Sequence, residues 1–248
     1  MKREHDSLRF LLAASVLTVA LWFIPFASFA VYPFRLFVTF IHEGGHALAT
    51  LLTLGSVERI IIHPDGSGET YSRGGLQLLI ASAGYLASSL YGASLLVLCR
   101  KGHNARAALA VTAAAILALT VFFAGNPFSW LAGILLTIGL VLFASTANVR
   151  VAHFFLSFLA IQCCLNAIFD LRTIMMISAF TNSPSDASNL QHLTHIPAFV
   201  WASTWIGVSV GVLWLALRTY ARGIGRLSGL PLTTTRPTRQ QTGKFAAR

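Results

Sequence analysis

The amino-acid sequence predicts an all-α, polytopic membrane protein with about six to seven transmembrane helices and a short β-hairpin. Of its 248 residues, 55% are hydrophobic and only 10% are charged, whereas soluble domains carry about 25% charged residues. The apolar residues gather in seven runs, each near the ~20 residues that a helix needs to cross a bilayer. We therefore expect a multi-pass integral membrane protein whose surroundings are the lipid bilayer.

The seven apolar runs define the expected helices in chain order. They cover roughly residues 8–31, 34–54, 76–99, 105–124, 128–147, 151–180 and 196–217. The first run is too long for a signal peptide and lacks a small-residue cleavage site after it, so we expect it to be retained. Residues 1–221 are assigned to one membrane-embedded domain, and the basic residues 222–248, which lack hydrophobic periodicity, to a disordered tail.

Two segments between these runs are polar enough to lie outside the hydrocarbon region. Residues 57–63 are rich in β-branched side chains and too short to cross as a helix, residues 64–68 supply turn residues, and residues 69–72 can return as a second strand. This pattern predicts a β-hairpin, which must lie at the interface or under protein because open sheet edges do not face lipid. Residues 181–195 are predicted to form an extramembrane loop.

Charge and cysteine content exclude two classes of protein. Lys and Arg outnumber Asp and Glu by 18 to 8, but the basic residues gather in the tail and at the ends of apolar runs. That distribution indicates contact with lipid headgroups and no binding of nucleic acid. The three cysteines lie within or at the end of apolar runs, so neither a disulfide framework nor a CxxC metal site is expected.

Two acidic residues, Glu43 and Asp170, lie inside apolar runs. An acid at the centre of a membrane helix costs about 2.5 to 3.5 kcal/mol on the insertion scale. Acids retained at such a cost usually serve a function. Both residues are therefore candidates for a functional site.

Glu43 belongs to the pattern His42-Glu43-Gly44-Gly45-His46. Histidines four residues apart share one helix face and can bind one ion, and this HExxH arrangement places a Glu beside them as a general base. Composition alone predicts on the order of 0.004 such matches. The alternative of two packing histidines would leave three polar groups without a ligand inside a span. Gly44 and Gly45 allow close approach of either a substrate backbone or a neighbouring helix.

A catalytic Zn²⁺ needs a third protein ligand and an open position. Asp170 is the first candidate, because it lies inside a span and shares a helix face with Asn166, four residues earlier. It could instead pair with Arg150 or Arg172 in a structural role. Asp186, in the polar loop, is the second candidate. Further candidates are His153, His192 and His195.

Taken together, an HExxH motif inside a span, a hairpin after it and an Asn-then-Asp pair in a later span resemble the site-2 protease family of intramembrane zinc metalloproteases. In that family the HExxH span supplies two zinc ligands and the base, and a later span supplies an Asp ligand. The resemblance implies that His42, His46 and Asp170 bind Zn²⁺ and that Glu43 is the base.

Other segments are similar to the family's motifs or depart from them. Ala81-Ser82-Ala83-Gly84-Tyr85-Leu86 is similar to a degenerate form of the family's Gly-Pro core helix. Ser185-Asp186-Ala187 and Ile196-Pro197-Ala198 are similar to a compact, peptidase-like subfamily, and no insertion is large enough for a PDZ domain. The segment from Asn166 to Asp170 departs from the family's longer motif, because it has no Pro or Gly and only four residues separate Asn from Asp.

The resemblance implies a zinc-dependent endopeptidase whose substrate is a transmembrane protein. Glu43 would take a proton from the zinc-bound water and pass it to the leaving amine, and the hairpin would receive the substrate as an added strand. Two alternatives stay open. One is a non-catalytic zinc-binding scaffold of the same fold, which the presence of Glu43 disfavours. The other is a metal-ion transporter, which the small number of charges inside spans disfavours.

Overall fold

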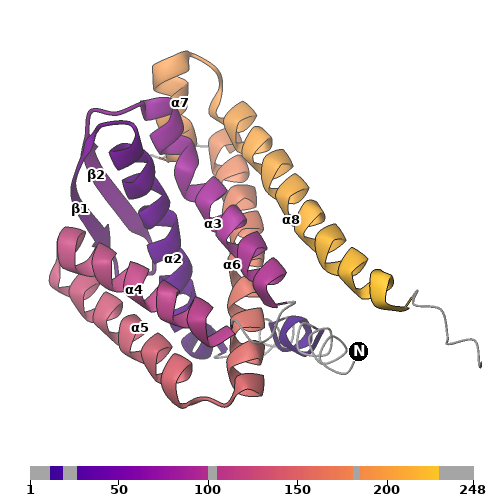
Figure 1. The fold of residues 1–248 in the computed structure, drawn as a ribbon. Coiled ribbons are helices and arrows are strands. Elements are labelled where there is room, and N and C mark those ends of the chain that lie inside the picture. The colour runs from indigo at the N-terminus through magenta and orange to yellow at the C-terminus, as the bar shows by residue number, and fades with distance from the viewer. Residues whose placement is uncertain (1–11, 19–26, 100–104, 181–184, 229–248) are drawn as a thin grey trace, which may run out of the picture.

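The computed structural model describes residues 12–18, 27–99, 105–180 and 185–228 (Figure 1). Residues 12–18 are helical, and the elements that follow are α2 (Ala27–Leu52), β1 (Ser56–Ile62), β2 (Gly68–Arg73), α3 (Gln77–Cys99), α4 (Ala105–Phe123), α5 (Pro127–Thr146), α6 (Val149–Phe180), α7 (Asp186–Thr194) and α8 (Ala198–Ser228). The two strands form one antiparallel sheet. Over the described residues, the prediction of a mostly helical protein with a short hairpin after the HExxH helix is confirmed.

Four helical segments in the described part of the chain are long and apolar enough to cross a membrane. They are Gln77–Leu98, Ala105–Phe123, Pro127–Thr146 and Ala198–Thr219, and Val149–Leu165 is a shorter apolar helix. Helix α2 is not among them and carries polar residues along its length. The total of six to seven spans therefore stays a prediction.

Helix boundaries differ from the apolar runs at two places. Helix α2 begins at Ala27 and continues through Pro33, where the sequence suggested a break between the first and second runs. Pro33 cannot donate to the carbonyl of Phe29, and Phe29 is 80% exposed. Helix α8 continues to Ser228 and so extends into the segment predicted as a tail.

Helix α3 is the central element and packs against α2, α6 and α8. Small residues allow these helices to approach. A Cβ added at Gly45 of α2 would lie 2.5 Å from the Cβ of Ala87 and 2.7 Å from the carbonyl oxygen of Ala83, both on α3. On the opposite side, a Cβ at Gly92 of α3 would lie 2.8 Å from Sγ of Cys164 on α6. Gly45 therefore serves close helix packing.

The hairpin lies against α2 (Figure 1). Its register pairs Ile62 with Gly68 and Ile60 with Thr70, and the pairing is irregular between Val57 and Arg59. Ile60 and Ile62 are fully buried, which explains why the β-branched run folds as a strand here. The tip of the hairpin is tied to α2 by two hydrogen bonds, from the Tyr32 hydroxyl to the Pro64 carbonyl and from the Thr39 hydroxyl to the Gly66 carbonyl.

The turn between α4 and α5 covers the outer edge of β1. The Gly125 amide donates to the Ile60 carbonyl at 2.8 Å, and the Ile62 amide donates to Oγ of Ser129 at 2.7 Å. The Asn126 side chain donates to the Ile62 carbonyl at 3.1 Å and also caps α5 by accepting from the Ser129 amide. This edge of the sheet is therefore satisfied within the protein, as an apolar environment requires.

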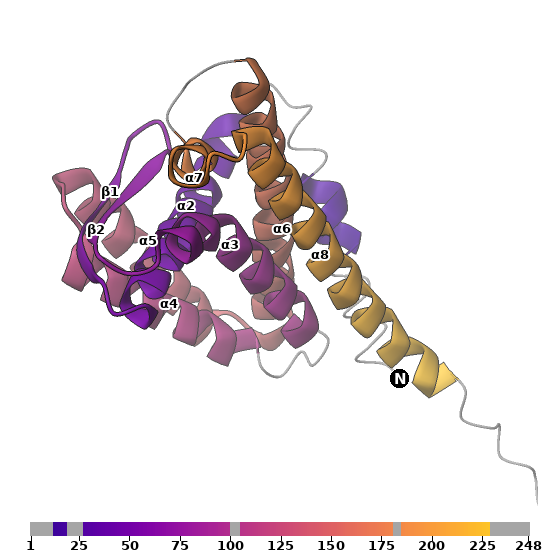
Figure 2. The ribbon, with the colours of Figure 1, turned by 90° about the horizontal axis from the view of Figure 1, so that it is seen from above.

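The expectation that residues 181–195 form only a loop is wrong, because Asp186–Thr194 is helix α7. Ser185 is its N-cap, accepting from the Ser188 amide, and His195 ends it in a left-handed conformation with φ of 59°. Ala187 and Leu190 are buried with α3 and α8 residues. Seen from above, α7 lies at the end of the bundle beside α3 and α8 (Figure 2). Burial of this apolar face outweighs the polarity of the segment.

Candidate metal centre

His42 and His46 lie one turn apart on α2, and their Nε2 atoms are 3.0 Å apart. His46 is buried, and its Nδ1 lies 2.6 Å from the Ile80 carbonyl of α3. A carbonyl oxygen can only accept a hydrogen bond, so Nδ1 of the neutral ring carries the proton. The Nε2 lone pair then points to the His42 side, as a metal ligand requires.

Aromatic side chains hold the His42 ring. It makes an edge contact with Tyr85 of α3 at 4.5 Å between ring centroids, and Tyr85 stacks on Trp205 of α8 at 5.3 Å. Tyr85 and Trp205 are both buried. Three helices, α2, α3 and α8, therefore fix the position of this imidazole.

Asp186 brings a carboxylate to the two histidines. Its Oδ2 lies 3.5 Å from Nε2 of His42 and 3.4 Å from Nε2 of His46. Asp186 is the first residue of α7, and the Ser185 and Ser188 side chains form a capping box around it. Burial opposes ionisation of Asp186, but attraction to the two imidazoles in their protonated form, without an ion between them, outweighs it and holds the pKa of this carboxyl well below its usual range. The carboxylate could therefore serve as an anionic ligand beside the two histidines.

The three donor atoms have the separations that one tetrahedral ion needs. Two ligand atoms that are each ~2.1 Å from a zinc ion at the tetrahedral angle lie ~3.4 Å apart. The donor atoms of His42, His46 and Asp186 all lie within 4.8 Å of one another. Two imidazoles and a carboxylate are a donor set of catalytic zinc sites, which leave one position open for water or substrate.

Gly84 of α3 provides the space beside this centre. A Cβ at Gly84 would lie 2.4 Å from Nε2 of His42 and 2.5 Å from Nε2 of His46. Both contacts are to the donor atoms themselves. A side chain of any size at this position would therefore compete with a bound ion.

We expect Gly84→Ala to reduce zinc affinity by at least about 10- to 100-fold, the range for changes just outside a ligand set. The added methyl group forces the two Nε2 atoms apart, whereas the fold around α3 can remain. Zinc content per purified chain measures the effect. Gly207→Ala is the control, since nothing lies within 4 Å of a Cβ at Gly207. Full zinc content in Gly84→Ala would contradict the proposed position of the ion.

Glu43 follows His42 on α2, and its side chain is 3% exposed. Oε2 of Glu43 accepts a hydrogen bond of 2.7 Å from the Thr70 hydroxyl of β2. The backbone of β2 is close as well, because a Cβ at Gly68 would lie 2.7 Å from Oε1 of Glu43. The hairpin therefore holds the carboxylate that the HExxH pattern assigns as the base.

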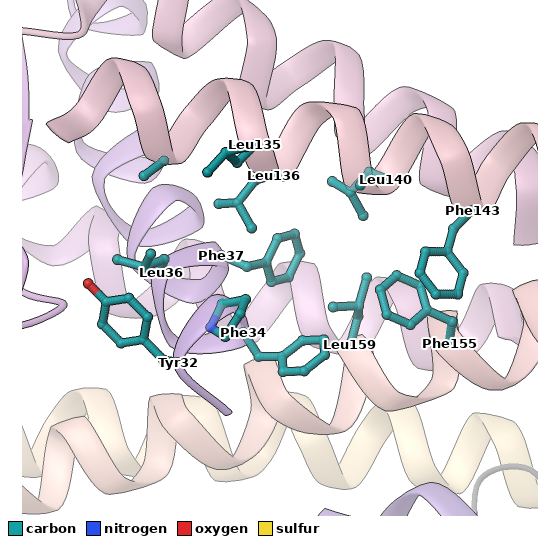
Figure 3. Close-up of a pocket in the computed structure, with 13 residues that line it drawn as sticks. Tyr32, Phe34, Leu36, Phe37, Leu135, Leu136, Leu140, Phe143, Phe155 and Leu159 are labelled. Carbon is teal, nitrogen blue, oxygen red and sulfur yellow. The ribbon is translucent and has the colours of Figure 1, made fainter. Parts of the chain in front are cut away.

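These groups share one open cavity of about 670 Å³. Its wall is formed by the HExxH residues of α2, strand β2, the first half of α3 and the first turn of α7. A second cavity of about 500 Å³ lies between α2, α5 and α6 and is lined by apolar side chains such as Phe37, Leu140 and Phe155 (Figure 3). Its lining includes one polar side-chain group, the Tyr32 hydroxyl, which donates to the Pro64 carbonyl.

The candidates from the sequence separate into three groups. His42, Glu43 and His46 are brought together with Asp186. Asp170 and Asn166 belong to α6, but their side chains lie outside the described residues. The other three candidate histidines lie away from this site: His192 and His195 line a separate cavity, and His153 is buried on α6.

Sequence reasoning missed three contributions to the site. The sequence predicts Thr70 only as part of a strand. The Ile80 contact is made by a backbone carbonyl, which no residue type reveals. The cap at Ser185 did have a signal, since a Ser followed by an acidic residue is typical of a helix start. Such a start would have placed Asp186 in the first turn of a helix.

Comparison with known sequences supports one family. A sequence profile of the Peptidase M50B-like family matches residues 11–216. No curated protein and no solved structure matches the chain. The matched stretch contains the HExxH motif, the hairpin and Asp186, and of the four candidate spans in the described residues it contains three whole and most of Ala198–Thr219. The chain therefore belongs to the Peptidase M50B-like family, the site-2 protease family, and is a multi-pass integral membrane protein.

Proposed function

We propose that this protein is a zinc-dependent intramembrane endopeptidase that hydrolyses peptide bonds of membrane-spanning proteins. The observation that carries the proposal is the buried Glu43 carboxylate in the same cavity as a three-residue donor set for a metal ion. Membership of a peptidase family supports the reaction class. The apolar helices around the cavity support a substrate that resides in the membrane.

His42, His46 and Asp186 would hold the zinc ion. Asp186 takes precedence over Asp170 in this proposal because its carboxylate lies within 3.5 Å of both imidazoles. A role for Asp170 stays a prediction from the sequence. The two assignments make opposite predictions for metal binding, which are argued in the Discussion.

Zinc bound to these residues would polarise the scissile carbonyl and make the attacking water more acidic. Glu43 takes the proton from that water and delivers it to the leaving amine, as a general base and then a general acid. The Thr70 hydroxyl donates to Oε2 of Glu43, and Oε1, which lies beside Gly68 of β2, would receive the proton. Tyr85 and Trp205 keep His42 in place during the reaction.

The substrate must be extended locally, since a helix hides its carbonyls in hydrogen bonds. Strand β2 lines the cavity, and its edge is the one that β1 does not use. The other edge of the hairpin is closed by the turn between α4 and α5. A peptide can therefore add to the sheet at β2, where the cavity brings it to Glu43 and the donor set.

We expect Ile61→Pro to lower cleavage while zinc content stays near one per chain. Ile61 pairs with Glu69 in the sheet, and proline removes a backbone donor from such a ladder. Ile61→Val, which keeps a β-branched side chain, is the control. Cleavage by Ile61→Pro at the wild-type rate, in correctly folded protein, would remove the hairpin from substrate presentation.

Metal stoichiometry combined with a cleavage assay tests the proposed function. One tightly bound zinc ion per purified chain, together with cleavage of a transmembrane peptide that a chelator stops, is the expected result. One zinc ion without cleavage would favour a non-catalytic scaffold. Several weak sites would favour a metal transporter.

A further inference from the structure

Thr70 of β2 is in direct contact with the proposed base. Its hydroxyl donates to Oε2 of Glu43 at 2.7 Å and lies 3.2 Å from the Glu43 carbonyl oxygen. Among the residues that the structure describes, no other side-chain hydrogen bond to this carboxylate is found. A hydrogen bond to an ionised acceptor is stronger than one between neutral groups, so Thr70 fixes the orientation of Glu43.

The backbone N–H and C=O groups of Thr70 point away from β1. In an antiparallel pair, residues alternate between those that bond across the pair and those whose N–H and C=O groups point away from it. The backbone groups of Ile60 and Ile62 point away from β2, because the Ile60 carbonyl accepts from the Gly125 amide and the Ile62 amide donates to Oγ of Ser129 in α5. Their partners in the register are Thr70 and Gly68. The N–H and C=O groups of Thr70 therefore face the open edge of β2.

The open edge of β2 lies on the cavity that contains the donor set. A peptide that adds to this edge would bond to the backbone of the same residue whose side chain holds Glu43. One residue thus joins the docking strand to the base. Two hydroxyls of α2 bond to the tip of the hairpin, that of Tyr32 to the Pro64 carbonyl and that of Thr39 to the Gly66 carbonyl.

We propose that Thr70 is a positioning residue with two roles: its backbone binds the extended substrate, and its hydroxyl orients Glu43 toward the bond to be cleaved. This inference rests on the proposed function, in which Glu43 is the base and β2 receives the peptide. The inference assigns a function to a residue that lies outside the HExxH motif. Docking of the peptide and orientation of the base would then depend on the same strand position.

Three substitutions separate the two roles. Thr70→Val keeps the β-branched shape and removes the hydroxyl, so kcat should fall by about 10- to 100-fold, the cost of a misplaced catalytic group, with KM and zinc content unchanged. Thr70→Ser restores the hydroxyl and should recover most of kcat. Thr70→Pro removes the backbone donor without breaking a bond to β1, and should also weaken binding of the peptide.

The assay uses a fluorescein-labelled synthetic transmembrane peptide and the full-length protein in detergent. Fluorescence anisotropy with metal-free protein gives the Kd of the peptide independently of catalysis. Thr70→Val should bind as the wild type does, whereas Thr70→Pro should bind more weakly. Thr39→Val is the matched control, because it removes a hydrogen bond between α2 and the hairpin that does not involve Glu43.

The results that would overturn the inference are specific. Wild-type kcat in Thr70→Val, or no recovery in Thr70→Ser, would remove the hydroxyl from catalysis. An equal loss in Thr39→Val would show that any anchor of the hairpin matters as much. Wild-type peptide affinity in Thr70→Pro would remove its backbone from substrate binding. Glu43→Gln is measured in parallel: if it cleaves normally, the proposed function fails, and if it is inactive while Thr70→Val is normal, only this inference fails.

Discussion

Glu43→Gln is expected to retain one zinc ion per chain and to lose peptide cleavage by about 10²- to 10⁴-fold, the usual contribution of a general base. Glutamine has the same shape, and its side-chain oxygen can still accept the hydrogen bond from Thr70. It cannot take a proton from water. Cleavage of a transmembrane peptide under single-turnover conditions measures the loss, and metal analysis of the same sample shows that the donor set is intact.

Glu58→Gln is the matched control for this experiment. Glu58 lies on β1, outside the cavity, and pairs with Arg73. The substitution removes one carboxylate, as Glu43→Gln does, but at a position outside the cavity, so zinc content and cleavage should stay near the wild-type values. Normal turnover by Glu43→Gln would exclude Glu43 as the base.

Asp186→Ala is expected to lower zinc affinity by more than the about 10- to 100-fold that second-sphere changes cause, and to abolish cleavage with it. The substitution removes the anionic member of the donor set and leaves two neutral imidazoles. Competition with a chelator measures the affinity. Asp65→Ala is the control, because Asp65 is exposed at the tip of the hairpin and bonds to Ser67.

Asp170→Ala makes the comparison decisive. If Asp186 is the third ligand, Asp170→Ala should keep zinc bound. The opposite pattern, with zinc lost in Asp170→Ala and kept in Asp186→Ala, would transfer the ligand role to α6. In that case the contact of Asp186 with the histidines would be an ion pair and nothing more.

The sequence was sufficient for features that depend on local spacing. His42, Glu43 and His46 were found because a separation of four residues fixes a shared helix face whatever the rest of the chain does. The hairpin was found because residues 57–63 are β-branched and turn residues follow them. Each of these two features depends only on residues that are close together in the sequence.

The position of Asp186 depends on long-range packing and could not be read in the same way. The cost of an acid inside a span favoured Asp170, and the polar composition of residues 181–195 suggested that Asp186 would be solvated. Burial of Ala187 and Leu190 against α3 and α8 instead carries Asp186 to the histidines. Two apolar residues in a short polar segment give a weak periodic signal, and their partners are far away in the sequence.

The route by which the donor set is assembled has a consequence for biogenesis. During synthesis of the chain, His42 and His46 emerge early, whereas Asp186 is added only after the hairpin and helices α3 to α6. A nascent chain that has inserted only α2 presents two imidazoles and the base, without the anionic ligand. With Asp186 as the third ligand, as proposed here, complete binding of the ion would wait until α7 docks on α3 and α8, and the proposed protease would become competent only after helices α3 to α6 are in place.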